Sequence, residues 1–174
     1  MAEIGRKIID RLSIAYLATV TADGRPRVHP VCPFFHGTGI CVGLIETSPK
    51  RRDLLRDGRY VLHALPGPSD AEFRLRGWAR AVDDGERAEL ARAERGSIPD
   101  TSRVFELLIA TAHTTVYRPG KNDLPAPTRR RWTAALADIA HWVAGRPARG
   151  WWHEVEVNPS DLTVSRHPPP SVAS

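Results

Sequence analysis

The sequence predicts a mainly β fold: a small closed or nearly closed antiparallel β-barrel with helices at its margins. The first half of the chain contains five or six short segments rich in apolar and β-branched residues. Turn signals made of glycine, proline or aspartate separate these segments, as in sheets whose strands are joined by tight turns. At 174 residues the chain has the length of one domain and can bury a core without disulfides. Together these features indicate a small barrel.

The N-terminal elements are a helix and a hairpin. Residues 4–12 place apolar side chains at helical spacing and predict a short amphipathic helix. A strand follows over 16–21 and stops at Asp23-Gly24, a strong hairpin turn signal. The chain returns as a strand over 25–31, whose two prolines predict an edge position.

The next elements alternate between strands and a short helix. A turn at Gly37-Thr38-Gly39 precedes a third strand over 40–45. The polar segment 47–59 predicts a loop and then a short helix, with Ser48 as N-cap and Pro49 as its first residue. Fourth and fifth strands are predicted over 60–65 and 72–82, the latter broken by Gly77.

The second half is less regular. Residues 84–95 have the composition of a solvated helix, and 104–117 fit a strand or a helix, with threonine and valine favouring the strand. We expect a loop over 119–127, and then a helix over 128–144 with Thr128 as N-cap. Final strands are expected over 151–157 and 162–166. Residues 1–166 are thus predicted as one domain, with 85–150 as a variable helical insertion or extension and 167–174 as a disordered proline-rich tail.

Composition excludes several classes of protein. No apolar run approaches the roughly 20 residues of a membrane span, and no signal-peptide core is visible, so we expect a cytoplasmic protein without a membrane partner. Two cysteines are too few for a disulfide scaffold, and Cys32 and Cys41 are expected to be small buried residues. The net charge is +5, and 22 of the 25 cations are arginine. A GC-rich genome and an anionic ligand both account for this excess, so local clusters must decide between them.

One such cluster opens the predicted short helix. Ser48, Lys50, Arg51 and Arg52 lie together, and the window 47–60 carries five cations against two acids. A phosphate needs fixed cations and hydroxyl donors, and the free N–H groups of a helix start add further donors. The alternative interpretation is an ordinary solvated helix start. Arg27 and His29, on one face of the preceding strand, could converge on the same anion.

Three segments carry a resemblance to a known family. LATVTADGRPRVHPV (residues 17–31) is followed by SPKRRDLLRDGR (residues 48–59), and Gly77-Trp78-Ala79 lies within the predicted fifth strand. In this order they resemble the pyridoxamine 5′-phosphate oxidase-like family of flavin-binding split barrels. The similarity covers roughly residues 4–84, with a weaker likeness over 151–166.

The resemblance implies a six-stranded antiparallel split β-barrel that forms a homodimer with its cofactor sites at the interface. It implies a flavin-dependent oxidoreductase that binds FMN and passes a hydride to or from a small organic substrate. The alternatives are a reductase that uses the deazaflavin F420, or a non-enzymatic flavin- or haem-binding protein. The flavin carries the reactive chemistry, so no catalytic side chain is assigned. The cofactor-binding residues implied are Arg27, Val28, His29, Pro30, Val31, Thr47, Ser48, Lys50, Arg51 and Arg52.

Aromatic and basic residues late in the chain suggest a substrate contact. Trp132 follows Arg129-Arg130-Arg131. If this segment is a helix, the simpler interpretation is that Trp132 packs against the barrel. The alternative interpretation places Trp132 and Arg131 at the substrate, with the arginines holding an acidic group. The histidines show no metal-ligand spacing, so no metal is expected. Nucleic acid is not expected as a partner, because aromatics are not interleaved with cations as a stacking platform requires. Pyridoxamine phosphate oxidase activity itself is not expected, because that enzyme's C-terminal substrate segment is not recognisable here.

Overall fold

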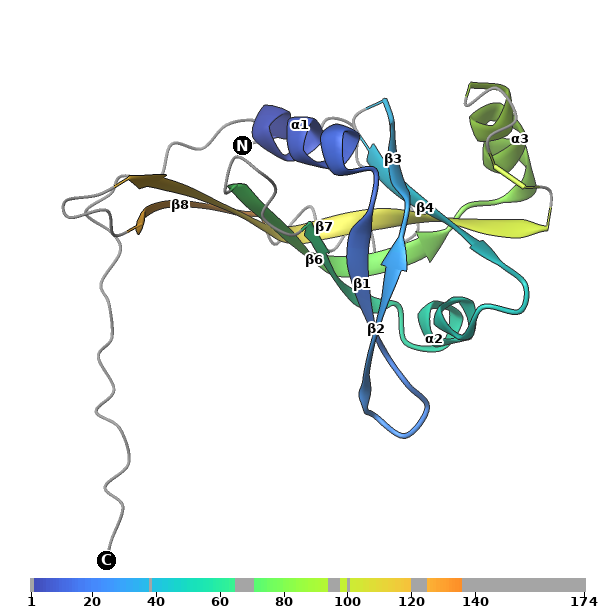
Figure 1. Ribbon diagram of the computed structural model, residues 1–174. Coiled ribbons are helices and arrows are strands. Elements are labelled where there is room, and N and C mark those ends of the chain that lie inside the picture. The colour runs from blue at the N-terminus through green and yellow to red at the C-terminus, as the bar shows by residue number, and fades with distance from the viewer. Residues whose placement is uncertain are drawn as a thin grey trace, which may run out of the picture.

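The computed structural model describes residues 2–37, 39–64, 71–93, 98–99, 101–119 and 125–135. This part of the chain folds into one antiparallel eight-stranded sheet with three helices (Figure 1). The strands are β1 (Ala15–Val20), β2 (Pro26–Val31), β3 (Pro33–His36), β4 (Gly39–Ile45), β5 (Arg59–Ala64), β6 (Ala71–Ala81), β7 (Ser102–Pro119) and β8 (Pro125–Thr133). The helices are α1 (Ala2–Leu12), α2 (Pro49–Arg56) and α3 (Asp84–Ala93).

The sheet curls because its two ends are neighbours in the sequence. Pairing follows the order β2-β1-β5-β6-β7-β4-β3, with β8 added to β7. β2 and β3 thus end the path, yet Cys32 alone separates them in the chain. One residue spans at most about 3.6 Å, so the two ends of the sheet must meet at this corner. The predicted mainly β, antiparallel barrel-like architecture is confirmed as a curled half-barrel, whereas the expected strand number of six is too low because β3 and β8 were not predicted.

The β1–β2 hairpin follows the sequence pattern closely. Gly24 has a φ of 81°, a left-handed conformation that glycine adopts without a steric penalty. Register runs from Ala15 opposite Val31 to Val20 opposite Pro26. Among the described residues β2 pairs with β1 alone, which confirms the edge position that its prolines predicted.

The long strands β6 and β7 lie at the centre of the sheet. β7 resolves the ambiguity over residues 104–117 in favour of a strand. Residues 105–116 of β7 pair with the whole of β6, and the other side of β7 pairs first with β4 and then with β8. The register with β6 shifts between Arg76 and Gly77, so Ala110 has no partner on β6. A β-bulge of this kind bends a strand and increases its twist.

One predicted helix is wrong where the structure describes it. Residues 128–133 belong to β8, which starts at Pro125, inside the segment expected to be a loop. These residues form a strand despite the helical pattern around Trp132, because the whole of β8 pairs with β7. The expected helical character of 85–150 therefore holds for α3 but not for β7 and β8.

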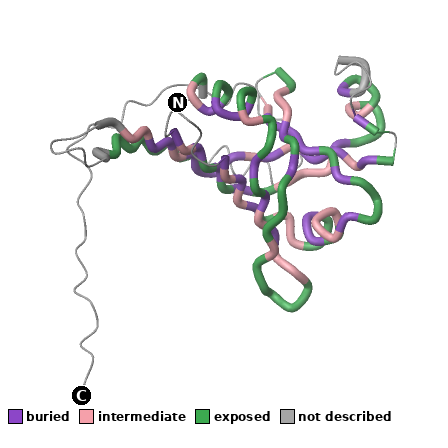
Figure 2. Tube along the Cα trace, viewed as in Figure 1, coloured by how far each residue is buried: buried purple, intermediate pink, exposed green. Residues whose placement is uncertain are grey.

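The two faces of the sheet have different surroundings. We call inner the face that carries Leu17, Leu62 and Leu75 into the main core, and outer the opposite face. α1 covers the inner face through Ile8 and Ile9, and a Cβ at Gly5 would lie 2.3 Å from the Phe73 ring. α3 lies against the outer face of β4 and β7 through a second cluster of Cys41, Val82, Leu90, Ile98 and Val104. The alternation of buried and exposed residues along the strands follows this division (Figure 2).

The two cysteines differ in burial, and the C-terminal segments are not described. Cys41 is buried as expected, but Cys32 is exposed at the β2–β3 corner. The strands expected over 151–157 and 162–166, the tail 167–174 and the domain end at 166 lie outside the described residues. No helix among the described residues is long and apolar enough to cross a membrane.

Candidate functional site

A buried carboxylate joins the β1–β2 hairpin to α2. Asp53 of α2 is 4% exposed, and its Oδ2 accepts hydrogen bonds from Thr19 Oγ1 at 2.9 Å and from Arg27 Nε at 2.8 Å. Thr19 and Arg27 are directly opposite each other on β1 and β2, so both side chains reach the same inner face. The charge and hydrogen bonds together hold α2 against the hairpin. We call this region, made of Arg27, Ser48, Lys50, Asp53 and Arg56, the hairpin–helix corner.

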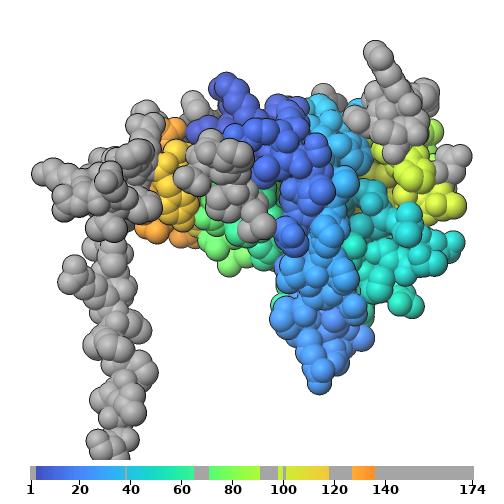
Figure 3. Space-filling model, in the orientation of Figure 1, coloured from blue at the N-terminus to red at the C-terminus, as the bar shows by residue number. Residues whose placement is uncertain are grey.

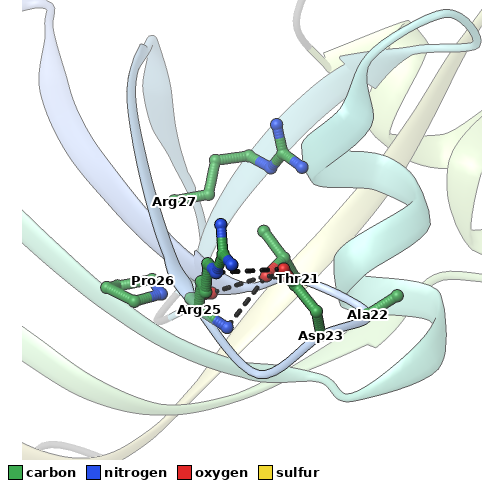
Figure 4. Close-up of a pocket in the computed structure, with 6 residues that line it drawn as sticks. All are labelled: Thr21, Ala22, Asp23, Arg25, Pro26 and Arg27. Carbon is green, nitrogen blue, oxygen red and sulfur yellow. Dashed lines mark hydrogen bonds and ion pairs between the residues drawn. The ribbon is translucent and has the colours of Figure 1, made fainter.

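Arg56 adds a second link between the same elements. Its Nη2 donates to the carbonyl oxygen of Val20 on β1 and lies 3.4 Å from Asp53 Oδ1. The hairpin projects from the body of the molecule beside α2 (Figure 3). At its tip a hollow of about 450 Å³ is lined by Thr21, Ala22, Asp23, Arg25, Pro26 and Arg27, and the Arg27 side chain extends above it toward the helix (Figure 4).

Lys50 brings a second cation to the corner. It lies three residues before Asp53, hence on the same side of α2. Partial burial of the Lys50 ammonium lowers its pKa, and the nearby Arg27 guanidinium lowers this pKa further. Arg27 uses its Nε for Asp53, and no group among the described residues engages its Nη atoms. Two converging cations with unused donors make this corner suited to an anion.

Ser48 supplies a hydroxyl without a partner. It precedes Pro49, the first residue of α2, as the sequence predicted, but its side chain makes no capping hydrogen bond. Its Oγ is buried and has no hydrogen-bond partner among the residues that the structure describes. A buried hydroxyl normally finds a partner, so an orphaned one at a helix start suits an external acceptor such as a phosphate oxygen. No acidic residue lies in the first turn of α2 to oppose such a ligand.

The other predicted residues of this segment surround the corner. Thr47 and Arg52 are exposed, and Arg51 is half-buried. Their side chains have no hydrogen bond or ion pair with other residues in the described ranges. The structure brings Arg27 and Lys50 together at the start of α2, which Ser48 precedes and where Arg51 also lies.

The β2 residues alternate between two roles. Arg27, His29 and Val31 lie on the inner side, where Val31 joins the core and His29 is exposed, whereas Val28 and Pro30 face outward. The carbonyl of Arg25 accepts from Thr21 on the β1 side, so Pro26, Val28 and Pro30 direct their backbone groups to the free edge. Because proline has no N–H, Val28 supplies the one N–H donor of these three.

The outer face holds a groove that the sequence analysis did not predict. Its volume is about 470 Å³. Its lining includes the apolar side chains of Ala18, Val61 and Trp78, together with Arg59 and Arg76. Trp78 is 42% exposed. The alternation Arg74, Arg76, Trp78 along one strand was the signal that could have placed these side chains on one face.

The predicted substrate residues lie apart from the corner. Trp132 and Arg131 are neighbours on β8, so their side chains point to opposite faces. Trp132 packs against the main core, whereas Arg131 is exposed. β8 and α2 are at opposite ends of the molecule (Figure 1). Within one chain, the structure does not bring these two residues to the hairpin–helix corner.

Comparisons with known proteins agree with this architecture. Among solved structures, a haem-binding protein from Mycobacterium smegmatis matches with a TM-score of 0.59 and 20% identity, over 80% of this chain and 59% of that one. A Clostridium acetobutylicum protein of the pyridoxinephosphate oxidase family, related to general stress protein 26, matches with a TM-score of 0.57 and 10% identity, over 79% and 96%. A NimC/NimA family protein from the same organism matches with a TM-score of 0.52 and 16% identity, over 73% and 93%. These identities support the fold alone.

Sequence comparison is more specific. No curated protein matches the chain significantly. A family model described as pyridoxamine 5′-phosphate oxidase matches residues 2–115, which include the hairpin, α2 and most of β7. The chain belongs to the pyridoxamine 5′-phosphate oxidase-like family.

Proposed function

We propose that this protein is an FMN-dependent oxidoreductase whose cofactor phosphate binds at the hairpin–helix corner. The observation that carries the proposal is the convergence of Arg27 and Lys50 beside the orphaned, buried hydroxyl of Ser48. A phosphate dianion would accept from all three groups and from the free N–H groups at the start of α2. Arg51 and Arg52 would add charge at the border of the site, with Thr47 beside them.

The free edge of β2 supports the placement of a flat ring. An isoalloxazine carries both acceptors and a donor along one edge, and β2 offers the Val28 N–H and outward carbonyls in a row. This assignment gives Val28, Pro30 and neighbouring His29 the contacts with the ring that the family resemblance implies. When bound, FMN would supply hydride transfer, so the chain needs to bind, orient and shield rather than provide a nucleophile.

A second copy of the chain belongs to the proposal. The ring edge on β2 is open on one side, and the outer face exposes Tyr16, Val28 and Trp78 beside the apolar groove. Large exposed apolar side chains gathered on one sheet face are typical of association surfaces. A homodimer formed through this apolar part of the outer face would complete the cofactor site and enclose a small organic substrate.

Haem is the second candidate ligand. The family includes flavin oxidoreductases and haem-binding proteins, and the M. smegmatis protein named above is described as haem-binding. The deazaflavin F420 remains the alternative cofactor. Its anionic tail would need a wider basic surface than the corner offers. Arg129–Arg131 could extend this surface only from a second chain, because β8 and α2 are at opposite ends of one chain. A haem carrier would bind its ligand tightly but would have no reducible substrate.

An absorbance spectrum of the purified protein, followed by titration with FMN, F420 and haem, tests the proposal. We expect saturable quenching of FMN fluorescence in the wild-type protein. The double variant Lys50→Gln, Arg51→Gln should lose about tenfold or more in FMN affinity, because it removes two charged contacts to the phosphate. Lys7→Gln, an exposed cation on α1 paired with Glu3, is the control for a lost positive charge far from the corner and should bind like the wild type. Preference for F420, a Soret band with haem, or equal FMN binding by the double variant would overturn the proposal.

A further inference from the structure

A row of basic side chains crosses the outer face away from the corner. Arg131 of β8 is directly opposite His113 of β7, which is directly opposite Arg74 of β6. Residues opposite each other in antiparallel strands share a face, and the core positions of Ala112, Leu75 and Trp132 place this row on the outer one. Adjacent strands are about 4.8 Å apart, so the Arg74 and Arg131 backbones are separated by roughly 10 Å across His113.

Two further arginines flank the row. Arg76 lies two residues along β6 from Arg74, and Arg129 lies two residues along β8 from Arg131, each on the same face. All four arginines are exposed, and none forms an ion pair with another residue in the described ranges. The nearest acid on these rows, Glu72, lies 2.9 Å from His63 Nε2. Four cations thus share a small area with little local compensation.

Hydroxyl and imidazole groups lie between the arginines. Thr111 is opposite Arg76 and Thr133, and Thr115 is opposite Glu72 and Arg129. His113 occupies the centre between them. Its pKa is lowered by partial burial first, and then by the charges of Arg74, Arg131 and Arg76, which Glu72 opposes only in part. This centre is therefore a place of high positive potential with neutral donors at hand.

We propose that the Arg74–His113–Arg131 row is a binding site for a small organic molecule that carries a phosphate or pyrophosphate group. Guanidinium groups bind phosphate oxygens in pairs, and threonine hydroxyls and a neutral imidazole add single hydrogen bonds. Glu72 offsets one of the four positive charges, so a di- or trianion matches the remaining three better than a single carboxylate does.

This site is separate from the proposed FMN phosphate site. The corner is built by the β1–β2 hairpin and α2, whereas the row belongs to β6, β7 and β8 at the other end of the sheet (Figure 1). The two sites share no residue, and the inference does not depend on FMN binding at the corner.

His113 reports on this site directly. We would follow its imidazole resonance by NMR, assigned with the variant His113→Gln, while titrating the full-length protein with inorganic pyrophosphate. We expect a saturable shift in the wild type and a rise in the pKa of His113 on binding, since a nearby anion favours the protonated ring. The expected affinity loss is about tenfold or more for Arg131→Gln and for Arg74→Gln.

Two variants make the outcome decisive. Lys7→Gln lowers the net charge by the same amount elsewhere and should change the affinity by less than about twofold. Lys50→Gln, in the hairpin–helix corner, should leave the His113 titration unchanged. An unmoved His113 resonance would overturn the inference, and so would a pyrophosphate affinity in Arg74→Gln and Arg131→Gln equal to that of the wild type. A His113 shift abolished by Lys50→Gln would overturn it too, because the anion would then be bound at the corner.

Discussion

Arg27 donates a hydrogen bond from Nε to Oδ2 of Asp53 over 2.8 Å, and this pair ties β2 to α2. The Asp53 side chain is 5% exposed and that of Arg27 is 32% exposed. The arginine is thus anchored at one end and open at the other. The same buried carboxylate that stabilises the corner fixes the direction in which the Arg27 guanidinium is presented.

Removing this carboxylate should be strongly destabilising. Asp53→Ala leaves a partly buried guanidinium and the Thr19 hydroxyl without their acceptor, and breaking a buried ion pair from one side costs about 3–5 kcal/mol. Urea unfolding followed by circular dichroism measures the change. Thr19→Val, which removes one neutral donor and keeps the ion pair, should cost only about 1 kcal/mol. Equal losses in the two variants would mean that the ion pair contributes little.

Lys50→Met should separate stability from binding. Folding lowers the pKa of Lys50 from its ordinary value of 10.5, mainly through partial burial. The charged ammonium therefore reduces the free energy of unfolding at pH values below the lowered pKa. This reduction disappears as the pH rises toward 10.5. We expect the variant to be at least as stable as the wild type near neutral pH and to lose this advantage near pH 10.5. Its FMN affinity should fall about tenfold or more. A variant that is less stable at neutral pH would show that the Lys50 charge is well compensated.

Ser48→Ala should affect binding more than folding. A working N-cap serine contributes about 1 kcal/mol, but the Ser48 side chain makes no capping bond, so we expect a stability change below about 0.5 kcal/mol. Loss of a hydrogen bond to a charged phosphate should weaken FMN binding about tenfold. Thermal unfolding without ligand and fluorescence titration with FMN measure the two effects. A large loss of unligated stability would contradict the description of Ser48 as an orphaned donor.

Gly77→Ala should distort the centre of the sheet. A Cβ at Gly77 would lie 1.8 Å from the carbonyl oxygen of Leu108, so one of the two backbones must move. We expect a loss of about 3 kcal/mol in the free energy of unfolding. Gly43→Ala is the matched control, because its nearest neighbour would be Ser102 Cβ at 3.8 Å, an ordinary contact. Similar losses in both variants would indicate that glycine-to-alanine replacement in this sheet is harmful for reasons other than the Leu108 contact.

Local chemistry in the sequence determined most of the first half of the fold. Asp23-Gly24 specified the hairpin, Pro26 and Pro30 specified its edge, and Ser48-Pro49 specified the start of α2. These signals depend on a few neighbouring residues, because a positive φ, a missing N–H or a helix start is decided within one turn. The motifs around them also pointed to the family that the comparison of residues 2–115 establishes.

Tertiary structure decided what local pattern left open. The segment 128–133 has the residues of a helix but forms β8, because pairing with β7 satisfies its backbone and buries Trp132. Asp53 was not expected to matter, since nothing near it in sequence shows that a threonine and an arginine of another element would converge on it. The row from Arg74 through His113 to Arg131 likewise joins residues far apart in the chain. Strand register creates such neighbours, and register is fixed by the burial of one whole face of the sheet, not by any single segment.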